Sequence, residues 1–179
     1  MGSEQMVHTR QIRVESYDIG DGQLLIRGSL EDNRPQPMRL ADGEVRPPGV
    51  VHGLRLEMVV KCPDFTITSV EASMPNVPQD ACREALPTFQ ALVGQRISPG
   101  FTDRTKRLLG GNKSCAHFVS LILAMAPSAI QAYGAILGRR EDIISTEGIA
   151  DRLRYLINTC LVWAEDGPMV QRLRKRLES

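Results

Sequence analysis

The hydropathy pattern changes its period once along the chain, and this change constrains the fold more than any other feature. From His8 to about position 75, apolar and polar residues alternate, which is typical of strands with one buried face. After Pro78 the apolar positions recur at helical spacing. We therefore predict an α+β fold, in which an N-terminal antiparallel sheet or partly closed (split) β-barrel precedes a helical C-terminal half.

Four strands are expected, over residues 8–18, 23–30, 50–61 and 65–74. Gly20-Asp21-Gly22 predicts a hairpin turn between the first two, and a polar, Pro-rich loop over 31–48 separates the second from the third. The short connections favour antiparallel pairing. The apolar phase of the last strand shifts near Ser69, which predicts a β-bulge there.

Helices are expected in the second half, over 79–93, 102–109, a long segment ending at Leu137, 144–163 and 169–177. Asn112 or Ser114 could cap the long helix. Pro87 should kink or end the first helix, and Pro127 should kink the long one. Pro168 suits the first turn of the last helix.

The length of 179 residues fits one domain. Residues 1–7 are expected to be a disordered or tag-derived start, followed by a single domain over 8–179, mainly strands over 8–75 and mainly helices over 79–179. The near-balance of 22 basic and 21 acidic residues, with a net charge of +1, gives no electrostatic reason to expect nucleic acid or an anionic membrane as a partner. The start lacks the pattern of a signal peptide, and the apolar stretch over 118–126 is too short to span a bilayer, so we expect a cytoplasmic protein.

The four cysteines lie far apart and form no Cys-x-x-Cys pair. A zinc knuckle or ribbon is therefore not expected, and a cytoplasmic location disfavours disulfides. No nicotinamide, flavin or phosphate-binding fingerprint is visible, so our first interpretation involves neither a cofactor nor a metal.

Two of the three histidines lie at the ends of inward-facing apolar stripes. Residues two apart in a strand share a face, so the phase of Ile12 and Val14 extends back to Arg10 and His8. The phase of the strand over 50–61 places His52 at the mouth of its apolar stripe. Because histidine titrates near neutrality, we expect His8, Arg10 and His52 to project into one cavity suited to acid–base chemistry.

The third histidine, His117, falls at the start of the long apolar helix. Lys113 lies in a segment that lacks the glycine a phosphate-binding loop requires, but a helix N-terminus suits an anion or a phenolate. Cys115 and His117 should point about 200° apart on a helix, so only one can face a small site, and we favour His117. Cys115, Lys113 and Glu71 are kept as candidate substrate-binding residues, although the expected bulge leaves the face of Glu71 undecided.

Several short segments occur together in one order. They are His8-Thr9-Arg10, Asp21-Gly22 followed by a strand from Ile26 to Asp32, His52 before Leu54-Arg55-Leu56, Glu71-Ala72-Ser73-Met74 before Cys82, and Cys115-Ala116-His117-Phe118. From His8 to about Gly134, this series resembles the bacterial domain-of-unknown-function family 2889. The chain departs from that pattern at Asp18-Ile19, where an arginine is commoner. Similar proteins occur in bacteria that degrade aromatic compounds, including lignin-derived ones, so the resemblance implies a small cofactor-free enzyme acting on a phenolic compound.

Three functions remain open from these residues. The first is a cofactor-independent carbon–carbon lyase that releases formaldehyde from a phenolic compound, with His8, His52 and His117 as acid–base groups and Arg10 stabilising an anion. The second is a non-catalytic small-molecule-binding or assembly protein, and the third is a metal protein with histidine ligands. A small aromatic substrate and a homodimer are the expected partners, because an open sheet leaves edges that pairing would cover.

Overall fold

The computed structural model describes residues 3–40 and 43–178, except for the side chains at 143 and 144. Met1 and Gly2, at the expected disordered or tag-derived start, lie outside the described residues, and residues 3–8 precede the first strand without regular structure. By their contacts the residues form two compact units that divide between Ala129 and Ile130. That 8–179 is a single domain stays a prediction.

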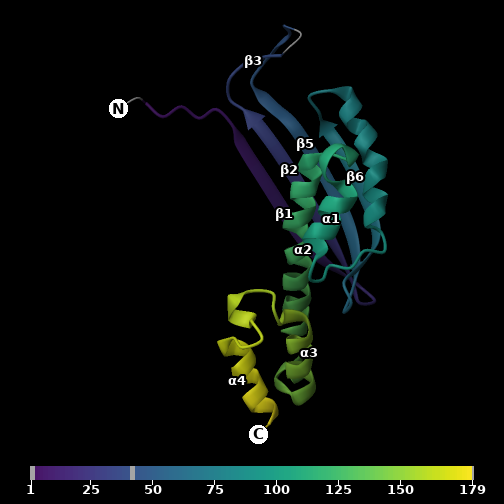
Figure 1. Ribbon diagram of the computed structural model, residues 1–179, viewed down its shortest axis with the longest axis vertical. Coiled ribbons are helices and arrows are strands. Elements are labelled where there is room, and N and C mark those ends of the chain that lie inside the picture. Colours follow the sequence, from purple (N-terminus) through teal and green to yellow (C-terminus); the bar gives the residue numbers. More distant parts are fainter. Residues whose placement is uncertain (1–2, 41–42, 179) are drawn as a thin grey trace. The chain divides into compact units, whose positions relative to one another are not determined.

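The first unit contains an open four-stranded antiparallel sheet (Figure 1). Its strands are β1 (Thr9–Gly20), β2 (Gln23–Arg34), β5 (Gly49–Lys61) and β6 (Thr66–Asn76), in the order β1-β2-β5-β6. The short strands β3 (Met38–Arg39) and β4 (Val45–Arg46) pair with each other separately. The α+β prediction is confirmed in its antiparallel form, and the sheet does not close into a barrel.

The prediction from the sequence ends β2 too early. Its composition predicts a loop from residue 31, yet the strand continues to Arg34 because β1 and β5 pair with it on both sides. The two-stranded β3–β4 hairpin also lies inside the segment expected to be a loop. The bulge near Ser69 is confirmed, since Val59 pairs with Ser69 while Val60 pairs with Ile67.

One face of the sheet forms the core with the long helix α2 (Ala116–Leu137). Fully buried side chains on the strands include Ile26, Leu30, Leu54, Leu56 and Met58, and those on α2 include Phe118, Leu121, Ile122 and Met125. A Cβ atom on Gly28 would lie 2.4 Å from the sulfur of Met125, so glycine permits the helix to approach the β2 backbone closely. Further along, the Ser16 hydroxyl donates to the Ser128 carbonyl at 3.5 Å. The contacts therefore place α2 along the inner face of β2.

Helices α1 (Phe101–Leu109) and η1 (Asp80–Leu92) complete this unit with the short η2 (Gly111–Lys113). The segment predicted as a helix over 79–93 forms the 3₁₀-helix η1, which contains Pro87, so this proline does not end the helix. Pro127 likewise lies within α2. By length and composition α2 could cross a membrane, a criterion that a buried core helix also meets.

The second unit contains η3 (Glu141–Ile144), α3 (Thr146–Leu156), η4 (Leu161–Trp163) and α4 (Pro168–Leu177). Its small core consists of Ile149, Leu153, Val170 and Leu173. The prediction of one helix over 144–163 is wrong, because α3 ends at Leu156 and Asn158 adopts a positive φ of 61° that a helix cannot continue through. Pro168 opens α4, as predicted.

Candidate functional site

The site is built around the buried carboxylate of Asp32. Asp32 is 3% exposed, and Asp32 and Thr105 are the buried polar residues of the described chain. Asp32 lies near the end of β2, and strand alternation places it on the same inner face as Leu30. The register pairs it with Arg10 on β1 and with His52 on β5. Three neighbouring strands thus present these side chains in one row across the sheet.

Arg10 binds both oxygens of this carboxylate. Its Nε donates to Oδ1 at 2.7 Å and its Nη2 donates to Oδ2 at 2.8 Å, which is the bidentate geometry that arginine forms with carboxylates. The Arg10 guanidinium lowers the pKa of Asp32 to about 2, against the opposing effect of burial. Asp32 is therefore ionised at neutral pH and is not itself a proton acceptor there.

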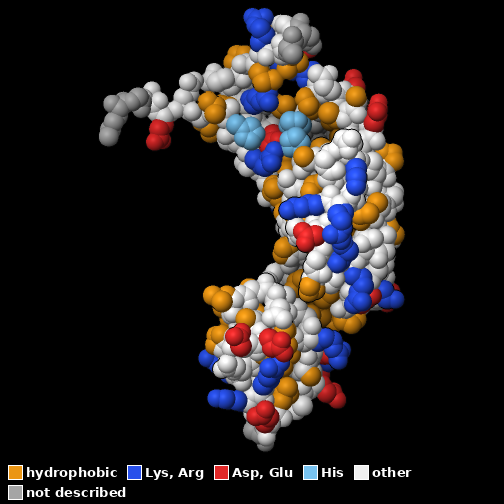
Figure 2. All heavy atoms as spheres, viewed as in Figure 1, with side chains coloured by type: hydrophobic (Ala, Val, Ile, Leu, Met, Phe, Trp, Pro, Cys, Tyr) orange, Lys and Arg blue, Asp and Glu red, His pale blue; other side chains and the backbone are white. Residues whose placement is uncertain are grey.

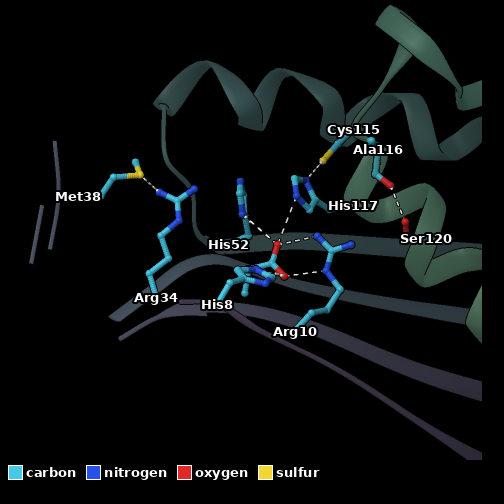
Figure 3. Close-up of polar contacts among 10 residues, drawn as sticks. His8, Arg10, Arg34, Met38, His52, Cys115, Ala116, His117 and Ser120 are labelled. Atoms are coloured by element: carbon cyan, nitrogen blue, oxygen red, sulfur yellow. Dashed lines mark hydrogen bonds and ion pairs between the residues drawn. The ribbon is translucent and has the colours of Figure 1, made fainter. Parts of the chain in front are cut away.

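All three histidines of the chain surround the same carboxylate (Figure 3). The Nε2 atom of His8 lies 3.3 Å from Oδ1, while Nδ1 of His52 and Nε2 of His117 lie 3.2 and 3.3 Å from Oδ2. The His52 and His117 rings stack, with centroids 3.9 Å apart and planes inclined by 28°. His117 reaches the carboxylate from the first turn of α2, which begins at this end of β2. The structure thus brings together all four residues predicted to be catalytic, His8, Arg10, His52 and His117.

Burial lowers the pKa of both stacked imidazoles below the ordinary value of 6.5. For His52, the attraction of Asp32 opposes this effect and the positive charge of Arg34 adds to it. For His117, the charge of His52 lowers the pKa further and Asp32 again opposes. Both rings are therefore neutral at pH 7, and each offers a nitrogen lone pair that can accept a proton.

The cluster is accessible to a ligand, although its centre is buried. The side chains of His8 and Arg10 are 44% and 38% exposed, whereas those of His52 and His117 are 18% and 27% exposed. Figure 2 shows the histidines on one face of the molecule around an acidic side chain, with basic side chains on either side. A small molecule could therefore contact the imidazoles directly.

Cys115 also belongs to this site. Its sulfur lies 3.5 Å from Nδ1 of His117. The expectation that Cys115 and His117 point in different directions is wrong, because α2 begins at Ala116 and Cys115 precedes the helix. The angular spacing of a helix therefore does not apply to this pair. The thiol is placed to orient the His117 ring.

Two predicted substrate-binding residues lie elsewhere. Glu71 is exposed and pairs across the strands with Glu57, whose neighbours Leu56 and Met58 face the core, so Glu71 lies on the outer face of the sheet. The Lys113 ammonium donates to the Arg107 carbonyl at 2.6 Å, near the end of α1. Within the part of the chain that is described, no ion pair or hydrogen bond joins either residue to the cluster.

The sequence prediction omitted Asp32, the residue that organises the site. The signal was present, because the alternation through Leu24, Ile26 and Leu30 reaches Asp32 after one further step of two residues. An acidic residue at a core-facing position requires a partner, and Arg10 on the neighbouring strand provides one.

A metal ion is the alternative occupant of this cluster. Asp32, His52 and His117 each offer a ligand atom, and these atoms all lie within 4.8 Å of one another. Two histidines and a carboxylate suit several transition metals, and Nδ1 of His52 is buried without a hydrogen bond. The Arg10 fork opposes a cation here, because it already engages both carboxylate oxygens.

The family model described as "Protein of unknown function (DUF2889)" matches residues 8–131 of the chain. The chain belongs to this family. The match confirms the resemblance inferred from the ordered segments, and it contains every residue of the Asp32 cluster. No curated protein and no solved structure matches the chain. The activity must therefore be argued from the site itself.

Proposed function

We propose that this DUF2889 protein is a cofactor-independent carbon–carbon lyase. Its substrates would be phenolic compounds that carry a hydroxymethyl group, including lignin-derived ones, and it would release this group as formaldehyde. The observation that carries the proposal is the convergence of three imidazoles and one guanidinium on the buried Asp32 carboxylate. Such a cluster provides both proton transfer and stabilisation of an anion at one accessible place.

The reaction needs two proton transfers and no oxidant. One imidazole removes the proton of the hydroxymethyl O–H group, and the carbon–carbon bond breaks as the C=O bond of formaldehyde forms. The electron pair of the broken bond remains on the carbon that carried the hydroxymethyl group. A second imidazole, protonated from solvent beforehand, delivers a proton to this carbon, and the first imidazole then returns its proton to solvent. The two products together contain the atoms of the substrate, and no electron is gained or lost.

The positions of the side chains suggest their roles. His52 and His117 are stacked, and their lowered pKa values leave them neutral, so one can act as the base while the other, once protonated, acts as the acid. Arg10 supplies positive charge beside a developing phenolate. Asp32 positions the groups around it, and His8, the most exposed of the three histidines, is placed to contact the substrate.

The test is formaldehyde release from a panel of lignin-derived phenolic dimers that carry a hydroxymethyl group. We expect turnover by the wild type, loss of most of it in His52→Gln and His117→Gln, and full turnover in the matched surface variant Glu71→Gln. Full activity in every histidine variant would exclude acid–base catalysis by the cluster. No turnover of any phenolic would favour the small-molecule-binding protein.

The convergence of three ligand atoms at Asp32, His52 and His117 favours a metal protein as the second candidate. The same assay separates the two, because an acid–base lyase keeps its rate after extensive dialysis against a chelator. A rate that is lost on chelation and restored by Zn²⁺ or Fe²⁺ would replace the first proposal with the second. Metal analysis of the purified protein provides an independent measurement.

A further inference from the structure

The two edges of the four-stranded sheet differ. The β6 edge is covered by the segment that follows η1, since the Ile67 amide donates to the Gln95 carbonyl at 2.9 Å and the Gly94 amide donates to the Ile67 carbonyl at 2.8 Å. β1 is the other edge (Figure 1), and within the described part of the chain β2 is its only sheet partner. The outer side of β1 therefore presents backbone donors and acceptors to which a further strand can pair.

This edge lacks features that usually protect an exposed strand from pairing. Natural edge strands are often short, bulged or interrupted by proline. β1 is 12 residues long, contains no proline, and pairs with β2 without a bulge from Thr9 to Asp18. Ile12 and Tyr17 are each 40% exposed. The charged side chains of β1 therefore decide which strand can pair with it.

A second copy of the chain is the partner that these charges favour. In a two-fold dimer that continues the sheet, each residue keeps its face, and opposite residues of an antiparallel pair share a face. Opposite residues then differ by an even number of positions, so the axis passes at a residue. Centring on Arg13 or on Glu15 places that residue opposite its own copy, which is destabilising for like charges. Centring on Ile12 or Ser16 brings no two charged residues opposite each other.

Centring on Val14 brings only opposite charges together. Arg13 then lies opposite Glu15 of the partner subunit on the outer face. Arg10 lies opposite Asp18 of the partner subunit on the inner face. Each pair occurs twice by symmetry, so the charge pattern of β1 is complementary to itself in this one register.

We propose that two copies pair antiparallel through their β1 edges about Val14, so that Asp18 of the partner subunit binds Arg10 in the Asp32 cluster. Arg10 lies on the inner face because it is opposite Asp32. Asp18 lies on the same face because it is opposite the buried Leu24. Opposite Cβ atoms of antiparallel strands are about 4.5–5.5 Å apart, which is within reach of an ion pair between these two side chains.

Both side chains have atoms left for this contact. Arginine has five N–H donors, and the fork from Arg10 to Asp32 uses one on Nε and one on Nη2, so Nη1 remains. The Arg10 side chain is 38% exposed, which leaves room for the approach. Asp18 accepts from the Gly20 amide through Oδ1 at 3.1 Å, and Oδ2 is the oxygen that faces Arg10. A second carboxylate fixes the guanidinium against Asp32, which makes Asp18 of the partner subunit a positioning residue.

A charge swap on the outer face tests the register without changing the site. Arg13→Glu places a carboxylate opposite Glu15 of the partner subunit, so the dimer dissociation constant from analytical ultracentrifugation should rise about tenfold or more. The double variant, Arg13→Glu with Glu15→Arg, restores opposite charges and should return to within about threefold of the wild type. The matched control is Arg55→Glu, which should leave the dissociation constant unchanged. Arg55 is exposed and lies opposite Ser29 and Ser73, away from the edge.

The contact between Arg10 and Asp18 is tested at the dimer and in the assay for formaldehyde release. Asp18→Asn and Arg10→Gln should each weaken the dimer, and the two together should weaken it no further, because either one already breaks the pair. For turnover the inference rests on the proposed function. Each variant alone lacks a complete site, whereas a mixed dimer has one site with Arg10 from one copy and Asp18 from the other. An equal mixture, assayed above the dissociation constant, should therefore approach about a quarter of the wild-type rate and exceed the mean of the two variants.

The inference and the proposed function fail in different ways. A monomer at micromolar concentration, or a double charge-swap variant that does not recover, would overturn the pairing. Additive effects of Asp18→Asn and Arg10→Gln on the dimer, or a mixture that only averages the two rates, would overturn the contact at the site. A dimer that follows the charge swap, without turnover of any phenolic, supports the pairing and refutes the lyase.

Discussion

Replacing Asp32 by asparagine tests the central feature of the site. The substitution keeps the shape of the side chain but removes the charge that Arg10 and the three histidines surround. The pKa of Asp32 is lowered from 3.8 to about 2 in the folded protein. Since one pKa unit corresponds to about 1.4 kcal/mol, the charge of Asp32 stabilises the fold by about 2 kcal/mol at pH 7.

The sign of the pH dependence follows from the lowered pKa. The contribution is fully present well above the ordinary pKa of 3.8 and is lost as the pH falls through the folded pKa of about 2. At pH 3 about half of it should remain. We therefore expect Asp32→Asn to cost about 2 kcal/mol of unfolding free energy at pH 7 and about half as much at pH 3.

The assay must report on the sheet. Trp163, the one tryptophan of the chain, packs against the core of the second unit and would report on the wrong part. The backbone amides of β2 and β5 are hydrogen-bonded between the strands of the sheet. Their hydrogen–deuterium exchange in increasing urea, read by mass spectrometry of the β2 and β5 peptides, therefore follows unfolding of the sheet at both pH 7 and pH 3. Equal stability of the two proteins at pH 7, or a difference that does not shrink at pH 3, would refute the reasoning.

The remaining predictions concern rate, pH and assembly. His52→Gln or His117→Gln should slow formaldehyde release by about 10²–10⁴-fold. Arg10→Lys keeps the positive charge but loses the planar donor fork, so it should lower both kcat and kcat/KM. A kcat/KM that is unaffected in these variants, measured by steady-state kinetics, would contradict the assigned roles. The pKa values of His52 and His117 are lowered from 6.5, so both rings remain neutral at pH 7. The acid limb of the pH profile of kcat/KM should therefore lie below pH 6.5. An acid limb above that pH would argue against these two histidines as the bases. β1 is an edge of the open sheet and exposes Ile12 and Tyr17, so a homodimer is expected; light scattering at the monomer mass at micromolar concentration would refute it.

Local patterns in the sequence determine much of this protein by themselves. Alternation depends only on neighbouring residues, so it predicts the strands and the shared inward phase of His8, Arg10 and His52. The order of short segments predicts the family. The same local reasoning fails at the polar end of β2, where pairing with two neighbours outweighs composition, and at 144–163, where the backbone at Asn158 ends the helical region.

Only the tertiary structure decided that these residues form one site. The register of β1 and β5 against β2 places Arg10, Asp32 and His52 in one row, and register depends on contacts between distant segments that a single sequence does not display. The packing of α2 along β2, allowed by Gly28, brings His117 to the same carboxylate. Glu71 is excluded for the same reason, because pairing with Glu57 assigns it to the outer face. A buried charge needs partners within a few ångströms, and those partners come from three separate parts of the chain.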